Sequence, residues 1–220
     1  MSVKAKIVFY LIILPLWATG ISSYSRSPHP YIFYIDSCKY DVKKYYFDID
    51  LSDTSTYINA RVTITCKALA DLEQVFFEFN SALRVDSLTL NNIVCQYRLE
   101  NDLLSVSPLS FIKAGSHFTL QLSYHGVIES FGMWGGFRNE TDYRYRNRIT
   151  WSLSEPFFSY AWFPCKQDLS DKIDTVSMNI SVPDSLMAAG NGLLKSVEKL
   201  KGGKTCYRWL STYPMAYYLV

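Results

Sequence analysis

The chain of 220 residues carries 22 Lys and Arg against 20 Asp and Glu, a formal net charge of +2. The two signs are interspersed along the sequence, so the basic stripe typical of a nucleic-acid-binding protein is missing and nucleic acid is not an expected partner. Five cysteines are present, without a CxxC pair that would clip a metal or carry redox chemistry, and an odd number leaves at least one free thiol.

The first predicted element is a signal peptide helix. Lys4 and Lys6 precede an apolar run over residues 7–17, and small residues follow at 18–20. The run is about half the ~20 residues that a membrane-spanning helix needs. We expect cleavage between Gly20 and Tyr24, with an uncleaved anchor as the alternative.

The domain boundaries follow from this assignment, with residues 1–23 as signal peptide and 24–220 as one domain. We expect an exported protein, located in the periplasm, the extracellular space or the secretory pathway. No transmembrane segment is expected beyond the signal peptide.

Strict alternation of apolar and polar residues dominates the mature chain and predicts strands with one buried and one wet face. Cys66 falls on an apolar face and is expected to be a buried free thiol. The alternating segments are 45–51, 58–68, 118–124 and 176–182.

Turn signals separate these segments at the 8 to 12 residue spacing typical of a sandwich. Lys201–Lys204 is predicted to be a hairpin tip that pairs 193–200 with 205–210, and Met215–Val220 is predicted to be a further apolar strand. The predicted fold is all-β, a large antiparallel β-sandwich or saddle-shaped sheet.

One stretch, 126–147, lacks a clear period and contains Gly132, Gly135 and Gly136 among aromatic residues. We expect a long loop there. Loops of more than about 12–15 residues inside compact domains are usually functional or disordered. A crossover packed on the sandwich edge is the alternative.

Catalytic and metal-binding motifs are missing from the sequence. The three histidines are neither four residues apart nor next to a carboxylate, so HExxH is absent and we assign no catalytic residue and no metal ligand. His117 stands at a polar strand position and is expected at the surface. The carboxylate pairs Asp48/Asp50 and Asp168/Asp171 are interpreted as solvated charges or turn caps.

The most informative segment is Trp151–Asp174, WSLSEPFFSYAWFPCKQDLSDKID. Its elements Glu155-Pro156, Phe163-Pro164-Cys165, Gln167-Asp168 and Asp171-Lys172, followed by an alternating strand, resemble the N-terminal domain of aminopeptidase N-type zinc metallopeptidases. Gly190-Asn191-Gly192 and Pro214–Val220 resemble the family's later turn and closing strand. The resemblance therefore covers most of the mature chain.

Two departures concern motif residues. The family often has Thr-Gln shortly before the acidic residue, where this chain has Ser152-Leu153-Ser154. Its common Asp-Glu-Pro after the Cys becomes Lys166-Gln167-Asp168. Subfamily and substrate preference are therefore not indicated.

The resemblance implies that Glu155 helps to bind the free α-ammonium group of a peptide substrate, because a carboxylate in a cleft makes a charge-assisted bond that an internal amide cannot make. The alternative is that Glu155 begins a turn before Pro156 and pairs with a basic neighbour. Phe157, Phe158, Tyr160 and Trp162 are candidates for the cleft wall or, equally, for core packing.

In the family's complete enzymes, zinc and its ligands belong to the catalytic domain that follows, and no such segment is found by Val220. The resemblance thus implies a catalytic metallopeptidase domain as partner, no cofactor in this chain and no activity of the chain alone. Because the sequence ends on a predicted apolar strand, we expect a fragment or a truncated reading frame.

Two other functions stay open. The first is a stand-alone secreted β-sandwich that binds glycans, suggested by the 16% aromatic content and by Trp134, Tyr143 and Tyr145 in the predicted loop. The second is a structural or adhesion domain without a small-molecule site.

Overall fold

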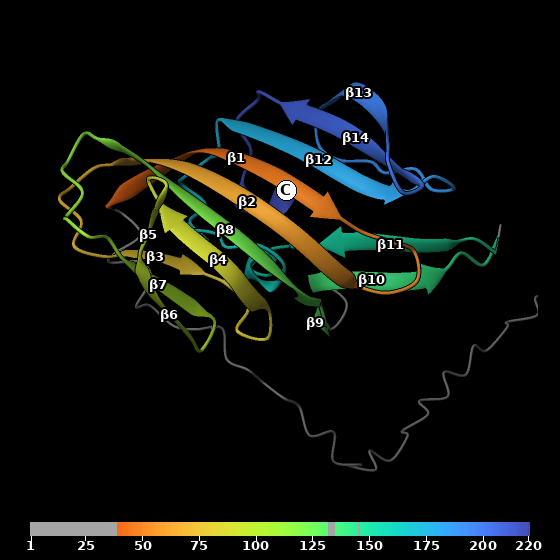
Figure 1. Cartoon of the computed structure of the whole chain (residues 1–220), viewed down its shortest axis with the longest axis horizontal. Coiled ribbons are helices and arrows are strands. Elements are labelled where there is room, and N and C mark those ends of the chain that lie inside the picture. The colour runs from red at the N-terminus through yellow and green to blue at the C-terminus, as the bar shows by residue number, and fades with distance from the viewer. Residues whose placement is uncertain (1–38, 132–134, 145) are drawn as a thin grey trace, which may run out of the picture.

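The computed structural model describes residues 39–131, 135–144 and 146–220 (Figure 1). Strands make up most of this part of the chain, and its helical residues are confined to two single-turn 3-10 helices, η1 (Ser159–Ala161) and η2 (Tyr217–Leu219). The prediction of an all-β fold is confirmed. The predicted signal peptide lies outside the described residues.

An eight-stranded sheet forms the main layer, with the strand order β13-β14-β12-β1-β2-β8-β4-β5. Its central strands alternate buried and exposed residues, as the sequence pattern predicted. The bounds are β1 (Tyr40–Asp50), β2 (Tyr57–Ala68), β4 (Arg84–Leu90), β5 (Ile93–Val94), β8 (His117–Val127), β12 (Thr175–Pro183), β13 (Leu193–Leu200) and β14 (Lys204–Ser211).

One pairing in this sheet differs from the antiparallel expectation. Strand β12 runs parallel to β1, with Tyr45 opposite Val176 and Ile49 opposite Ile180. The sheet is therefore mixed. Alternation reports which face of a strand is buried, but it is the same for both pairing directions, so the sequence pattern could not distinguish them.

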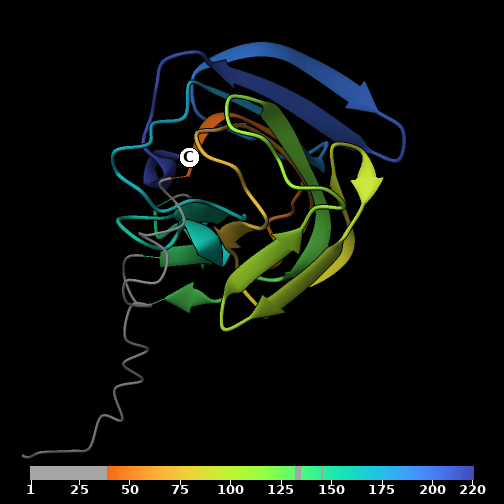
Figure 2. The ribbon, with the colours of Figure 1, turned by 90° about the vertical axis from the view of Figure 1, so that its left-hand side faces the viewer.

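Two three-stranded sheets lie on the inner side of the curved main sheet (Figure 2). One has the order β3-β7-β6 and the other the order β11-β10-β9. The bounds are β3 (Val75–Glu78), β6 (Gln96–Glu100), β7 (Leu103–Ser107), β9 (Ser130–Phe131), β10 (Gly135–Thr141) and β11 (Arg148–Leu153).

The core lies between these layers and contains a group of aromatic side chains. The Phe47 ring of β1 is fully buried, with its centroid 5.3 Å from that of Phe163 and 5.4 Å from that of Trp162. Edge-to-face and tilted contacts of this kind stabilise beyond simple area burial. The core therefore holds the irregular segment that follows β11 directly against the main sheet.

Two predicted elements are wrong. The segment 126–147 is not one long loop, because it contains the end of β8, strand β9 and strand β10, which pairs with β11. Gly135 lies in β10, and a Cβ there would come within 2.2 Å of the Phe158 ring, so this glycine serves close packing rather than a loop.

The C-terminal segment Met215–Val220 is also not a strand. Met215 makes one isolated bridge to Ile173, and the chain then turns into η2. An apolar run of this length has no period that separates a strand from a single helical turn.

Other predictions are confirmed. The hairpin β13–β14 turns at residues 201–203, where Gly202 and Gly203 have φ values of 84° and 75° that favour glycine. Cys66 is a buried free thiol and His117 is exposed. No helix within the described residues is long and apolar enough to cross a bilayer.

The aromatic core leads to a first prediction. Phe47→Ala should lower the free energy of unfolding by about 3–5 kcal/mol, because it removes a fully buried ring and leaves a cavity between β1 and the 162–163 segment. Urea unfolding followed by fluorescence measures the change. Lys44→Ala, at an exposed position of the same strand, is the control and should change stability by less than about 0.5 kcal/mol. Equal effects of the two substitutions would contradict this account of the core.

Candidate functional site

The residue predicted to bind substrate, Glu155, lies in an exposed turn between β11 and η1. The residue before it is anchored. The buried Ser154 accepts a hydrogen bond on Oγ from Trp162 Nε1 at 3.0 Å, and its carbonyl accepts one from the Phe158 amide at 3.0 Å. Since Trp162 belongs to the core, the start of the turn is tied to the main sheet.

The residue after Glu155 is anchored as well. The Tyr217 hydroxyl donates to the Pro156 carbonyl oxygen at 2.8 Å, and the Ser159 hydroxyl donates to the Tyr217 carbonyl oxygen at 3.2 Å. Burial raises the pKa of Tyr217, so the phenol keeps the proton that it donates. The backbone on both sides of Glu155 is therefore held by buried side chains from elsewhere in the chain.

The Glu155 side chain itself is exposed. Within the part of the chain that the structure describes, no hydrogen bond or ion pair joins its carboxylate to another residue. The alternative reading, in which Glu155 pairs with a neighbouring Arg or Lys, therefore finds no partner among those residues. The carboxylate is free to bind a cation from solution.

The aromatic candidates for the cleft wall differ in their surroundings. Phe157, next to Glu155, is 47% exposed. Phe158 is partly buried against Gly135, and Tyr160 is partly buried against the core. Trp162 is only 3% exposed and belongs to the core. Phe157 is therefore the candidate best placed to meet a bound molecule.

A buried ion pair lies on the loop that follows this segment. Lys166 Nζ is 2.6 Å from Asp171 Oδ2, and the two side chains are 4% and 7% exposed. The same Nζ donates to the Tyr40 carbonyl oxygen at 2.7 Å, while the Asp171 carboxylate accepts a hydrogen bond from the Val42 amide at 3.1 Å. The loop is thereby fixed to the start of β1.

The interpretation of Asp171 as a solvated charge or turn cap is wrong, whereas Asp168 does accept a hydrogen bond from the Ser170 amide at 2.9 Å, as a turn cap should. Burial raises the pKa of the Asp171 carboxyl, and the Lys166 ammonium opposes this. The sequence feature that could have predicted this ion pair is Lys166, a cation that precedes the two carboxylates by a few residues.

No group of three or more His, Cys, Asp or Glu side chains that could hold a metal ion occurs among the described residues. A hollow of about 370 Å³ is lined by residues of the β4–β5 and β7–β8 connections, Leu109 and Phe111 among them. It shares no residue with the Glu155 turn.

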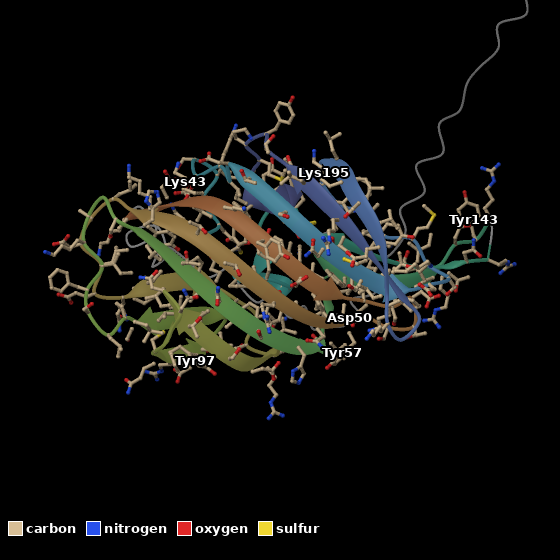
Figure 3. All side chains as sticks on the ribbon, turned by 45° about the horizontal axis from the view of Figure 1, so that its top comes forward. Lys43, Asp50, Tyr57, Tyr97, Tyr143 and Lys195 are labelled. Carbon is tan, nitrogen blue, oxygen red and sulfur yellow. The ribbon has the colours of Figure 1, made fainter. Side chains whose placement is uncertain are left out.

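One of the three aromatic residues that suggested glycan binding lies within the described part of the chain, between β10 and β11. Tyr143 is 88% exposed at the tip of the β10–β11 hairpin, where it stands away from the domain (Figure 3). Trp134 and Tyr145 lie outside the described residues. On the same sheet, the Arg138 guanidinium lies over the Trp151 ring, 5.6 Å from the ring centroid.

Comparison with known proteins agrees with the fold. The family model described as Peptidase M1 N-terminal domain matches residues 41–219. No curated protein gives a significant match. A crystal structure of an M1 zinc metallopeptidase from Deinococcus radiodurans is 22% identical, with a TM-score of 0.73, and the match covers 82% of this chain and 40% of that one.

Two further crystal structures give the same picture. A mutant M1 zinc metallopeptidase from Deinococcus radiodurans bound to a Tyr-Ser-Ala substrate is 22% identical, with a TM-score of 0.73 and coverage of 82% and 41%. A two-domain M1 zinc metallopeptidase mutant bound to L-arginine is 23% identical, with a TM-score of 0.74 and the same coverage. The chain spans about two-fifths of the length of these structures.

The buried ion pair gives a second prediction. Asp171→Ala should destabilise the domain by about 3–5 kcal/mol, because it leaves the Lys166 ammonium buried with Asp168 Oδ2, 3.6 Å away, as its one remaining counter-charge among the described residues. The double variant Lys166→Met/Asp171→Leu should lose less, since no buried charge remains. Urea unfolding at neutral pH measures both.

Glu100→Ala, which breaks the exposed Arg98–Glu100 pair, is the control and should leave stability nearly unchanged. A double variant as unstable as Asp171→Ala would show that packing, rather than charge, dominates at this position.

Proposed function

Because the chain belongs to the family of peptidase M1 N-terminal domains, we propose that it forms one wall of the substrate cleft in an aminopeptidase N-like zinc exopeptidase. In this role the domain binds the amino end of a peptide, and a catalytic metallopeptidase domain removes the N-terminal residue. Glu155 is the residue that contacts the α-ammonium group, with Phe157 beside it as part of the wall.

The observation that carries this proposal is the combination of a free, exposed carboxylate with an anchored backbone. Ser154 and Pro156 are both held by buried side chains, so Glu155 projects from a fixed point. An exopeptidase must distinguish a chain end from the interior of a chain. A fixed carboxylate does so because it forms a charge-assisted hydrogen bond with an ammonium group, which an internal amide lacks.

The bound molecules of the similar structures are consistent with that chemistry. One M1 zinc metallopeptidase is described with a Tyr-Ser-Ala substrate, and others with L-arginine and L-tryptophan. A free α-ammonium group is common to all three molecules. The proposal transfers this shared group to the present chain, and not the identity of the side chain.

Exposed apolar side chains support contact with a further domain. Tyr213 and Leu219 are 82% and 53% exposed, and in the sequence they stand before and after Tyr217, which binds the Pro156 carbonyl. Exposed large apolar side chains are a common component of interdomain surfaces. In the proposed enzyme, the catalytic domain would hold the zinc ion, which would supply Lewis-acid chemistry and an activated water there.

The proposed setting is outside the cytoplasm. The predicted signal peptide, with its basic residues Lys4 and Lys6 and the apolar run 7–17, supports export. A surface peptidase or a periplasmic peptidase would meet peptide substrates there.

A third prediction tests Glu155 in the complete peptidase that contains this domain. Glu155→Gln should lower kcat/KM for amino-acid anilides about 10- to 100-fold, because a charge-assisted hydrogen bond of about 1.5–3 kcal/mol to the α-ammonium group is lost. Initial rates over a range of substrate concentrations separate KM from kcat.

Glu129→Gln, which neutralises another exposed carboxylate, is the matched control and should leave both constants unchanged. Unchanged kcat and KM in Glu155→Gln would remove its ammonium-binding role.

A further inference from the structure

A second carboxylate lies at the end of β3, on the other side of the segment that carries the Glu155 turn. Glu78 forms an isolated bridge with Cys165, in which the Glu78 amide donates to the Cys165 carbonyl oxygen at 2.8 Å and the Cys165 amide donates back at 2.9 Å. The Glu78 side chain is partly buried, and its Oε2 accepts a hydrogen bond from Gln167 Nε2. Gln167 is therefore held between the β3 end and the Lys166 ion pair.

The oxygen of the Gln167 side-chain amide lacks a hydrogen-bond donor. Gln167 Oε1 is buried without a hydrogen-bond partner, and it is the one such side-chain oxygen or nitrogen in the part of the chain that the structure describes. A buried acceptor without a donor is costly, and native proteins almost always satisfy it. The Glu78 carboxyl, which already accepts from the Nε2 of the same amide, can supply a donor only if it carries a proton.

We propose that Glu78 is a neutral carboxylic acid in the folded domain and pairs with the side-chain amide of Gln167. The Glu78 hydroxyl donates to Gln167 Oε1, while Gln167 Nε2 donates to Glu78 Oε2. This acid–amide pair is a positioning element for Glu155. The acid and the amide then form two antiparallel hydrogen bonds. Both side chains are satisfied without a buried charge.

The electrostatic surroundings favour the proton. Burial raises the pKa of Glu78 to about 7, the charge of Asp102 adds to the increase, and the hydrogen bond from Gln167 opposes it. Within the described part of the chain, Glu78 also acts electrostatically on Cys165, on Tyr217 of η2 and on Tyr40 of β1, and none of these three is a cation. These groups therefore supply no positive charge that would stabilise an ionised Glu78.

The link to Glu155 runs through backbone contacts. Asn80, two residues after Glu78, donates from its amide to the Tyr160 carbonyl oxygen at 2.9 Å and from Nδ2 to the Ala161 carbonyl oxygen at 3.2 Å. Trp162 follows and holds Ser154 beside Glu155. Ionisation of Glu78 removes the hydroxyl that donates to Gln167 Oε1 and leaves two acceptors facing each other, which loosens the β3 end against the 160–165 segment. This positioning role rests on the proposed function, whereas the acid–amide pair does not.

The pair itself is tested on the purified chain. Glutamate labelled with ¹³C should show one carboxyl that titrates near pH 7 and is missing in Glu78→Gln, and infrared spectra at pH 6 should show the carbonyl band of a protonated acid that this variant lacks. Glu73→Gln, an exposed glutamate five residues earlier, is the control and should leave both signals in place. A Glu78 midpoint near about 4.3, the value of an exposed glutamate, would overturn the proposal.

The pH dependence of the free energy of unfolding tests the protonation of Glu78 independently. The pKa of Glu78 is higher in the folded state than in the unfolded state, so the folded state binds the proton more tightly. The stabilising effect is complete below the unfolded pKa and is lost as the pH rises through about 7. Wild type should therefore lose stability relative to Glu78→Gln between about pH 5 and 8. Parallel stability curves of the two proteins would contradict the proposal.

The positioning role is tested by the pH dependence of KM in the complete peptidase. Relative to Glu78→Gln, the KM of wild type should rise about twofold to thirtyfold from pH 6 to 8 while kcat follows the same curve in both proteins. Identical KM profiles would overturn the positioning role even where the titration confirms the acid. Failure of the Glu155 role is seen separately, in unchanged constants for Glu155→Gln.

Discussion

The structure depends on an irregular segment that runs through the core. Residues 162–165 are fully or almost fully buried between the main sheet and β3, yet they are not part of a sheet apart from the single bridge at Cys165. Buried carbonyl groups require donors, and two tyrosines supply them from the inner face of the main sheet. The Tyr124 hydroxyl donates to the Trp162 carbonyl oxygen at 2.6 Å, and the Tyr45 hydroxyl donates to the Pro164 carbonyl oxygen at 3.1 Å. Tyrosine suits this position because its ring fills the core and its hydroxyl reaches the backbone.

This constraint explains why the candidate site lies on a turn and is nevertheless well fixed. The Glu155 turn contributes little packing of its own, since Glu155, Pro156 and Phe157 are exposed. Its position comes from Trp162 and Tyr217, whose side chains are buried and whose polar atoms bind the turn. A binding group on a loop that rigid elements hold from both sides combines access to the ligand with a fixed direction. The free energy that orders the site is thus supplied by the core.

The features that could be predicted from the sequence are those that depend on local patterns of residues. Alternation located the strands of the main sheet, and glycines marked the β13–β14 turn, because burial on one face and positive φ are local requirements. Glu155 was reached through the resemblance of the 151–174 segment, not through any local property of a glutamate before proline. The parallel β1–β12 pair, the η2 turn and the burial of Asp171 were missed. Each is decided by contacts between residues far apart in the chain, such as Val42 with Asp171 or Glu78 with Gln167, which no window of sequence contains.

The loop after Cys165 shows how neighbouring residues can use opposite electrostatic solutions. Lys166 points toward β1 and satisfies its charge with Asp171 and the Tyr40 carbonyl, whereas Gln167 points toward β3 and meets a carboxyl for which no cation is at hand. On the first side, the Lys166 ammonium stabilises the ionised Asp171 carboxylate, although burial still raises the pKa of that carboxyl. On the second side, a protonated Glu78 both accepts from Gln167 Nε2 and donates to Gln167 Oε1, so one of the two proposed hydrogen bonds is lost when base removes the proton. A loop fixed by one contact of each kind is held by an ion pair on the β1 side and by a neutral acid–amide pair on the β3 side, and it is the second contact that weakens as the pH rises through about 7.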